Sequence, residues 1–475
     1  MPKDTLFDML ARLGNEDILP MHMPGHKRAL SAFPWLSSLG GAFDITETEG
    51  FDDLNAPEGV LRDMEERAAR LWGSRAAYLS VNGSTGGMFA ALSACGRGGV
   101  LIARNCHRSV FNAAEKLGLR AEYLMPSRVE GYGIFGEITP DEAAKRLRET
   151  GCKALVVTSP TYEGVTSDIS ALAEAAHSAG ALLIADAAHG AHLGLSEAFP
   201  PSAVREGADI VVTSLHKTLP ALTQTALLHV CSERADVDDI AAGMATFCTS
   251  SPSYVLMASV DGMLRYFENG GSSRLDALAD ALSDFRKKAC GFRRLRVLGA
   301  GDKEANTVNI DASKIYIDCI KCNFSGHTLK RRAREEFGIE LEYAGGRGAL
   351  AYATIGDDEG SLNRLFAALS AIDGEDEPLF AESSYPDFPP FGERVLPLGE
   401  AALRGRGYLP LEEAEGRIAA ESVYVYPPGV PVLLPGERVT AECVGYLLAA
   451  KREGAEVAAP RGVLRGKLRV TVPRE

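Results

Sequence analysis

The segment Ala208–Lys217 joins an apolar, β-branched run to a polar end whose side chains can do chemistry. The run closes on Ser214, His216 and Lys217. A lysine just past a buried strand can be partly desolvated, which makes its amine nucleophilic. The segment therefore predicts an amine nucleophile at Lys217. A solvated lysine that follows a strand is the alternative.

A second apolar run, Ala181–Ala188, carries one carboxylate, Asp186. A buried carboxylate needs a partner, because burying an unpaired charge is costly. The partner can be a helix N-terminus or a protonated pyridine nitrogen. A lysine and an aspartate at strand ends suit pyridoxal phosphate (PLP): the lysine forms a Schiff base, and the aspartate keeps the ring nitrogen protonated. The spacing of Asp186 and Lys217 leaves room for one helix and one strand, which predicts neighbouring strand ends.

The turn Asn82–Gly87 follows an apolar run and opens a helical pattern. Its small residues, Gly86 among them, let the backbone approach a phosphate closely. The free N–H groups and the helix dipole then favour the dianion, and the hydroxyls of Ser84 and Thr85 add donors. The alternative is an ordinary helix cap with a tight turn.

Histidines follow several of these runs. His107 can stack on a planar cofactor, or it can bond to the backbone at a helix entry. His189 can face a substrate, whereas His192 suits a structural role. A metal site made of His189, His192 and His216 is the other interpretation, but no carboxylate stands at matched spacing.

Strand-like and helix-like segments alternate from about residue 71 to residue 230. This pattern predicts an α/β fold with a mostly parallel sheet covered on both faces, and ligand sites at the carboxyl ends of its strands. The expected strands cover 75–82, 99–105, 120–125, 153–159, 181–188, 208–214 and 225–230, and helices start at Ser84, Arg108, Pro140 and Asp168.

The rest of the chain predicts further domains. Residues 255–292 indicate one or two long amphipathic helices, 293–370 mix strand and helix signals, and Pro386–Pro390 is turn-rich. We expect a PLP-binding large domain with an N-terminal arm over 1–290, a small α/β domain over 291–385 and a C-terminal subdomain over 386–475.

The 475-residue chain carries a net charge of −14, which argues against nucleic-acid binding and against an anionic membrane surface. That charge suits a cationic substrate, or it serves solubility alone. The nine cysteines form no disulfide pattern, and Cys319 and Cys322 make a single CxxC without a second pair. No signal peptide or transmembrane run is visible, so we expect a cytoplasmic protein.

The order of the phosphate turn, the stacking ring, the aspartate and the lysine resembles fold-type I PLP enzymes, whose fold is like that of aspartate aminotransferase. Within that class the chain is similar to the Orn/Lys/Arg decarboxylase family in its short form, from about Leu19 onward. The resemblance is carried by His22–Lys27, Asp52–Gly59, Asn82–Gly87, Asn105–His107, Asp186–His192, Ser214–Lys217, Thr249–Tyr254 and Tyr426–Glu437.

The resemblance implies a role for each matching position. Lys217 would be the Schiff-base lysine, Asp186 the partner of the pyridinium, and His107 the stacking ring. The phosphate would be held by Ser84, Thr85, Gly86, Ser214 and His216, and by Ser250 and Ser251 from a neighbouring subunit. The active sites would thus be shared across a homodimer, which can assemble further. Glu342 matches a family glutamate near the distal amine of the substrate.

The expected activity is PLP-dependent decarboxylation of arginine, lysine or ornithine to the corresponding polyamine-type amine and CO₂. Lys217 or His189 would return a proton to Cα. An aminotransferase or a lyase of the same fold is the alternative. Aminotransferases bind the α-carboxylate with an arginine, for which Arg347 is the candidate. A binding or regulatory protein on the same scaffold is the third possibility.

Overall fold

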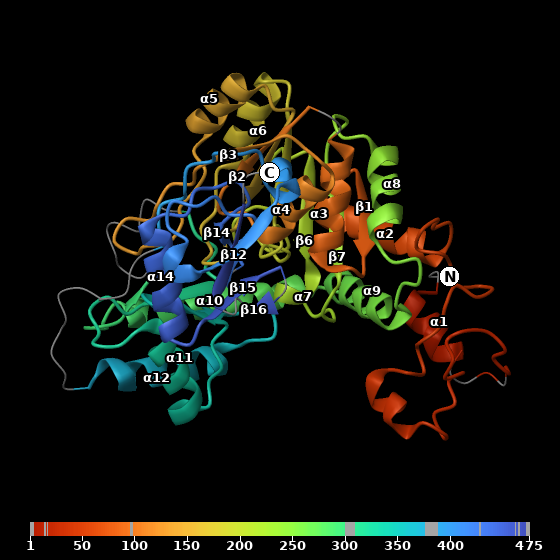
Figure 1. The fold of residues 1–475 in the computed structure, drawn as a ribbon. Helices are drawn as coiled ribbons and strands as arrows, with labels where there is room; N and C mark the ends of the chain where they lie inside the picture. Colours follow the sequence, from red (N-terminus) through yellow and green to blue (C-terminus); the bar gives the residue numbers. More distant parts are fainter. Residues whose placement is uncertain are drawn as a thin grey trace. The chain divides into compact units, whose positions relative to one another are not determined.

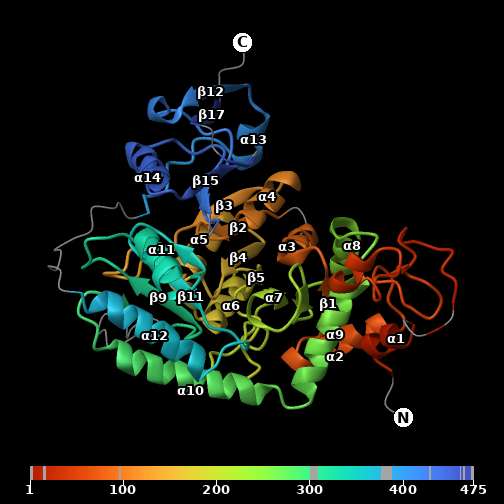
Figure 2. The same cartoon turned by 90° about the horizontal axis from the view of Figure 1, so that it is seen from below.

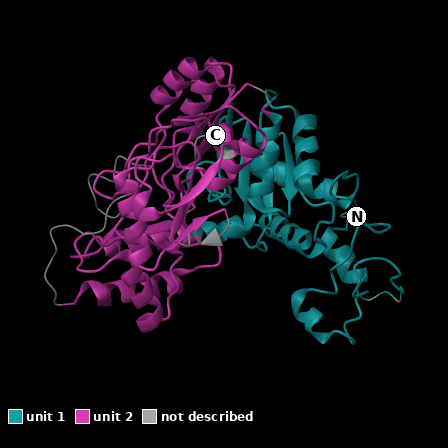
Figure 3. Ribbon diagram, viewed as in Figure 1, with its two compact units in different colours: residues 1–94, 182–276 teal, residues 95–181, 277–475 magenta. Residues whose placement is uncertain are grey.

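The chain alternates between two units in the computed structural model (Figure 3). Unit 1 contains residues 1–94 and 182–276, and unit 2 contains residues 95–181 and 277–475. The structure describes residues 4–13, 16, 18–95, 98–299, 309–375, 388–426, 429–460, 462–463 and 466–471.

Four strands of unit 1 lie in the order β1-β7-β6-β5. Their bounds are β1 Ala76–Ser80, β5 Leu182–Asp186, β6 Ile210–Ser214 and β7 Ala226–Val230. β5 is parallel to β6, whereas β7 is antiparallel to both β6 and β1. It follows that β1, β5 and β6 end at the same edge. The register places Ser80 and Ser214 on either side of Ala226.

Helices cover these strands within unit 1 (Figure 1). Their bounds are α1 Leu6–Leu13, α2 Val60–Trp72, α3 Gly83–Ala94, α7 Leu215–Thr218, α8 Val237–Phe247 and α9 Tyr254–Glu268, with a 3₁₀ helix at Pro34–Leu39. α3 packs beside α8 and against β6 and β7. The glycine at position 87 allows this close packing, because a Cβ there would lie 3.1 Å from a methyl group of Val212.

Three parallel strands of unit 2 lie in the order β4-β2-β3. They are β2 Val100–Ala103, β3 Ala121–Leu124 and β4 Ala154–Thr158, and the helices α4 Arg108–Lys116, α5 Pro140–Thr150 and α6 Ile169–Ser178 follow them. α5 and α6 lie side by side. Asp168 caps α6 by accepting the N–H of Ala171, at 2.9 Å. Because β2 and β4 are parallel neighbours, the residues that follow them lie at one edge.

A second, antiparallel sheet of unit 2 has the order β10-β11-β9-β8. Its strands are β8 Arg296–Val297, β9 Lys314–Asp318, β10 Tyr343–Ala344 and β11 Gly348–Tyr352. α11 Gly326–Phe337 packs on β10 and β11, and α12 Glu359–Asp373 lies beside α11 (Figure 2). α10 Ser272–Ala289 contains the boundary between residues 276 and 277.

The C-terminal part of unit 2 has its own apolar core, built from buried side chains between Leu411 and Val470. Its sheets are β14-β13-β15-β16 and β12-β17. The elements are α13 Leu398–Leu403, β12 Arg406–Pro410, a 3₁₀ helix at Leu411–Glu413, β13 Val423–Tyr426, β14 Pro431–Leu433, α14 Ala441–Arg452, β15 Glu456–Ala459, β16 Gly462–Val463 and β17 Lys467–Thr471.

The seven strands expected from apolar runs are confirmed as β1 to β7, each shorter than its run. The helices expected from Ser84, Arg108, Pro140 and Asp168 are confirmed as α3 to α6. The helical stretch 255–292 is two helices, α9 and α10. They are separated at Gly270, whose φ of +91° suits glycine. Residues 386 and 387 of the expected boundary, and 427 and 428 of the last motif, lie outside the described residues.

A buried ion pair joins the end of β2 to the last motif of the chain. Arg104 follows β2, and its guanidinium donates to both carboxylate oxygens of Glu437, at 2.8 Å each. The Arg104 side chain is 0% exposed and that of Glu437 is 1% exposed. The same guanidinium donates to the carbonyl of Pro431 at 2.7 Å and lies 4.1 Å from the centre of the Phe391 ring. The last motif is therefore fixed to the strand that precedes His107.

Replacing Glu437 by glutamine is expected to lower the free energy of unfolding by about 3–5 kcal/mol, because it leaves the Arg104 charge buried without its counter-ion. Chemical denaturation measures this change. The matched control is Glu393→Gln. Glu393 is 73% exposed and 3.3 Å from Arg438, so its loss should cost less than about 1 kcal/mol. Equal effects of the two changes would contradict the assignment.

Candidate active site

Lys217 lies in the short helix α7, directly after β6, and its ammonium contacts His189. The distance from Lys217 Nζ to His189 Nε2 is 3.0 Å. His189 is 8% exposed, and Lys217 is half-buried. At this distance one proton can be shared between the two nitrogens. The structure thus brings together two residues that sequence reasoning had singled out separately.

Asp186 is the last residue of β5, and β5 pairs directly with β6, the strand that leads to Lys217. Its Oδ1 accepts the backbone N–H of Ala188 at 3.2 Å, and the residue is 4% exposed. Burial raises the pKa of Asp186 above its usual range, while the positive charge of Lys217 acts in the opposite direction. The carboxylate therefore gains from a nearby cationic N–H donor.

The turn between β1 and α3 is shaped for close approach of a ligand to the backbone. Gly83 adopts φ +68°, a left-handed conformation that suits glycine. A Cβ at Gly86 would lie 3.0 Å from Asn82 Cβ and 3.2 Å from Cys248 Sγ. Ser84 is half-buried and Thr85 is exposed, both in the first turn of α3, where N–H groups lack intrahelical partners. The turn predicted to bind a phosphate is thus a helix N-terminus, which both the phosphate-site interpretation and the helix-cap interpretation required.

Ser214 and His216 flank the lysine on the β6 side. The Ser214 hydroxyl is buried and has no hydrogen-bond partner among the described residues. His216 Nδ1 donates to the carbonyl of Thr225 at 3.0 Å, so Nε2 is an acceptor in the neutral ring and a donor once the ring is protonated. Burial, helped by the charge of Lys217, lowers the pKa of His216. A buried hydroxyl without a partner is costly, so Ser214 indicates a ligand site.

The loop that carries Ser250 and Ser251 is anchored beside the same turn of its own chain. The N–H of Thr249 donates to the side-chain oxygen of Asn82 at 3.0 Å. Ser250 and Ser251 are both exposed. Their predicted reach into a neighbouring subunit stays a prediction.

The two remaining predicted site residues, His107 and Glu342, belong to unit 2. His107 caps α4: its Nδ1 accepts the N–H of Ser109 at 3.3 Å and lies 2.9 Å from that residue's hydroxyl. A Cβ at Gly429 would lie 3.2 Å from the His107 ring, so the last motif packs against this histidine. The helix-entry role considered for His107 is present in the structure, and its stacking role stays a prediction.

Glu342 precedes β10 and is exposed. Its Oε1 accepts the hydroxyl of Tyr162 at 2.5 Å. Burial, followed by the charge of Glu342, raises the pKa of Tyr162. Glu342 is therefore held in place by a tyrosine that follows β4.

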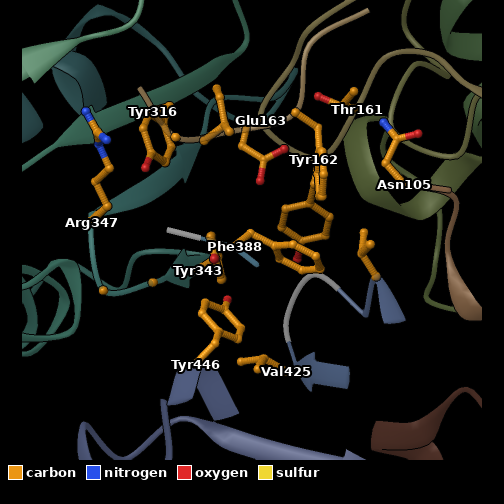
Figure 4. A pocket seen from close by; sticks show the side chains of 16 residues that line it. Asn105, Thr161, Tyr162, Glu163, Tyr316, Tyr343, Arg347, Phe388, Val425 and Tyr446 are labelled. Atoms are coloured by element: carbon orange, nitrogen blue, oxygen red, sulfur yellow. The ribbon is translucent and has the colours of Figure 1, made fainter. Parts of the chain in front are cut away.

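An open pocket within unit 2 was not foreseen from the sequence. We call it the unit 2 pocket, and its lining includes Asn105, Tyr162, Glu163, Tyr343, Phe388 and Tyr446 (Figure 4). Tyr162 and Glu163 follow β4 at its carboxyl end, within the segment Pro160–Gly164. That position was the signal that could have identified them, because ligand sites in parallel sheets lie at such ends.

Two family models match this chain. The Orn/Lys/Arg decarboxylase major domain matches residues 5–314, and the C-terminal domain of the same family matches residues 400–457. The chain belongs to the Orn/Lys/Arg decarboxylase family. It is therefore an amino-acid decarboxylase of a PLP-dependent family.

Sequence and structure comparisons agree with this membership. The arginine decarboxylase of Bacillus subtilis (strain 168) is 30% identical over 467 residues, which cover 96% of this chain and 95% of the relative. The Francisella novicida lysine decarboxylase LdcF has a TM-score of 0.81 at 18% identity, covering 98% of this chain and 81% of the other. The expected family is thereby confirmed.

The expected fold class, a fold-type I PLP enzyme of the α/β class, is confirmed as well. The ureidoglycine-glyoxylate aminotransferase of Bacillus subtilis has a TM-score of 0.54 at 16% identity, covering 68% of this chain and 87% of the other. Within the described residues, no helix is both long and apolar enough to cross a membrane.

The family and its fold relatives imply PLP, and unit 1 offers side chains that fit it. The buried Ser214 hydroxyl lacks a partner among the described residues, and the glycine at position 86 lets the first turn of α3 pack closely against Asn82 and Cys248. Burial raises the pKa of Asp186, and a cationic ring nitrogen beside the carboxylate would lower this pKa again. Lys217 lies beside His189. These four positions fit the phosphate, the ring nitrogen and the aldehyde of PLP.

Proposed function

We propose that this enzyme removes the α-carboxyl group of arginine to give the corresponding polyamine-type amine and CO₂, with lysine and ornithine as the competing substrates. Decarboxylation of a basic amino acid follows from the named relatives, among them the Bacillus subtilis arginine decarboxylase. The observation that carries the proposal is the arrangement of Lys217, His189 and Asp186 at the ends of β5 and β6.

The roles proposed for these residues follow from their positions. Bound PLP supplies an electron sink for the pair released when CO₂ leaves. Asp186 keeps the ring nitrogen of the cofactor protonated through its buried carboxylate. Lys217 attaches the cofactor, and the Lys217–His189 pair holds the proton that is delivered to Cα.

Further side chains are proposed to contact the cofactor and the substrate. Ser84, Thr85, Gly86, Ser214 and His216 would hold the phosphate, since they bring N–H or hydroxyl groups to helix N-termini at strand ends. His107 would stack on the cofactor ring, and Glu342 would bind the distal cation of the substrate.

One observation separates decarboxylation from the aminotransferase alternative. Arg347, the candidate for binding an α-carboxylate, donates through Nε to Asp318 Oδ1 at 3.3 Å and also contacts the carbonyl of Gly131. Asp318 is fully buried and also binds Arg296. Arg347 is thus already engaged by a buried carboxylate, which favours the decarboxylase.

The PLP-loaded enzyme is tested on arginine, lysine and ornithine, with released CO₂ and the product amine measured together. We expect CO₂ and amine in equal amounts, with the highest kcat/KM for arginine. Keto acid formed only when an amino-group acceptor is present would instead support transamination. A higher kcat/KM for lysine or ornithine would overturn the choice of arginine alone.

We further propose a homodimer with shared active sites, which can assemble further, in the cytoplasm. Its N-terminal arm exposes large apolar side chains over residues 18–39: Leu19 is 80% exposed, Met21 82% and Trp35 61%. Apolar clusters of this kind typically mark interaction surfaces. Ser250 and Ser251 would then complete the partner's phosphate site, and sedimentation as a monomer would contradict this. The division into domains at residues 290 and 385 belongs to the same proposal.

A further inference from the structure

The unit 2 pocket presents a buried carboxylate among aromatic and polar side chains. Glu163 lines it with a carboxylate, and Figure 4 shows that carboxylate pointing toward the middle of the pocket. Asn105 also lines it, is 5% exposed, and its Oδ1 has no partner among the described residues. The Glu163 carboxylate accepts from the Thr161 hydroxyl and from a backbone N–H, and a ligand that brings several N–H groups can fill its remaining acceptor positions.

Aromatic rings form much of the pocket wall. Tyr162 and Tyr343 meet edge to face at 5.9 Å between ring centres, and Phe135 and Phe388 do so at 4.9 Å. Tyr446 comes from α14 and lies 5.4 Å from Phe388. Ring faces attract cations, and a planar guanidinium also stacks on them, which an ammonium cannot do.

The cations near the pocket are already bound to protein groups. Arg347 is paired with the buried Asp318, and Figure 4 shows its guanidinium at the margin, away from Tyr162 and Phe388. Arg128 lies 4.5 Å over the Phe135 ring and donates to the carbonyl of Phe388 at 3.0 Å. The pocket therefore retains an anionic acceptor that neither arginine neutralises directly.

We propose that the unit 2 pocket binds a guanidinium group, with the Glu163 carboxylate as its counter-ion. This inference rests on the proposed function, because arginine is the proposed substrate that carries a guanidinium. The N–H donors of a guanidinium lie in one plane, so they can pair with the carboxylate while the plane faces the aromatic wall.

Glu163 is the lining group that titrates near neutrality. Burial raises the pKa of Glu163 to about 7, although the Thr161 hydroxyl and a backbone N–H act in the opposite direction. Burial likewise raises the pKa of Tyr162 and of Tyr316, so both stay neutral.

The charged groups packed around Glu163 are paired with one another. Behind Gly164, the buried Lys314 lies 2.6 Å from Asp311, and Lys314 also faces the Tyr352 ring. At the end of β9, Asp318 forms an ion pair with Arg347. A bound guanidinium therefore acts on Glu163 itself: it favours the carboxylate, and its affinity should rise with pH through 7.

The test uses the PLP-loaded enzyme and n-butylguanidine, a probe that has no primary amine to react with the cofactor. Calorimetry compares wild type, Glu163→Gln and the control Glu340→Gln, whose side chain is 59% exposed. We expect Glu163→Gln to weaken probe binding by about 10- to 100-fold, while the control and the visible absorbance of bound PLP stay unchanged. The neutral isostere n-butylurea should bind both proteins equally weakly.

The wild-type affinity should increase between pH 6 and pH 8, and that of Glu163→Gln should not. Probe binding to Glu163→Gln within about threefold of wild type would overturn the proposal. Because the probe is not a substrate, this result does not depend on turnover. An enzyme that decarboxylates arginine but shows no effect of Glu163→Gln refutes the pocket alone, and an enzyme that binds the probe but decarboxylates no basic amino acid refutes the proposed function alone.

Discussion

Replacing Lys217 by alanine is expected to abolish covalent attachment of PLP and to lower kcat by a factor on the order of 10⁴–10⁶, the size seen when a covalent catalytic residue is removed. The half-buried amine lies 3.0 Å from His189 Nε2 and next to the buried Asp186. No other lysine of the described part of the chain has this setting at a strand end. Absorbance spectra in the visible region and CO₂ release measure the two effects.

The control for this prediction is Lys116→Ala. Lys116 ends α4, is 70% exposed and contacts only its neighbour Glu115 at 2.7 Å. It should leave both the visible absorbance and kcat unchanged. Lys217→Arg tests whether the positive charge alone is sufficient, because arginine keeps that charge beside His189 but forms no covalent bond with an aldehyde. Retention of the visible band in either Lys217 variant would contradict the assignment.

Replacing Asp186 by asparagine is expected to lower kcat by about 10²–10⁴-fold, the range typical of losing a group that controls a proton in the reaction. Asparagine has nearly the same shape and keeps an acceptor for the Ala188 N–H, so β5 should stay intact. It cannot supply the negative charge that keeps a ring nitrogen protonated. Steady-state kinetics on the PLP-loaded variant measure the loss.

Stability separates this catalytic role from a structural one. Burial raises the pKa of Asp186 in the folded state, so the neutral carboxyl is the form that favours folding. This contribution to the free energy of unfolding is lost as the pH rises through the folded-state pKa. The cofactor-free Asp186→Asn protein should therefore be at least as stable as wild type at pH 8, and its advantage should shrink toward acid pH. A variant that is both inactive and clearly less stable at pH 8 would indicate a structural role instead.

Much of unit 1 could be predicted because its signals are local. The apolar runs that end at Asp186 and Ser214 are strands in the structure, and the glycine-rich turn after Asn82 is a helix N-terminus. Strand ends in a parallel sheet share an edge, so the order of these motifs along the chain was enough to predict one site. The family models confirm the family, and the single site stays a prediction.

The contacts that join distant segments could not be predicted in the same way. Arg104 and Glu437 are separated by 333 positions, and only the fold brings their charges together in a buried place. Arg347 was considered as a carboxylate ligand, but the buried Asp318 already holds it. Nothing in the local pattern distinguishes an exposed arginine from one that a neighbouring strand has engaged.

The sequence by itself determined the family and the α/β fold, and it predicted candidate residues for PLP, because strand patterns, glycine turns and reactive side chains are properties of short segments. The tertiary structure alone decided that Lys217 lies against His189, that the Ser214 hydroxyl lacks a partner, and that Glu163 is buried with a pKa of about 7. The reason is physical: burial and pairing set the energies of charged and polar groups, and both depend on neighbours that are remote in the chain.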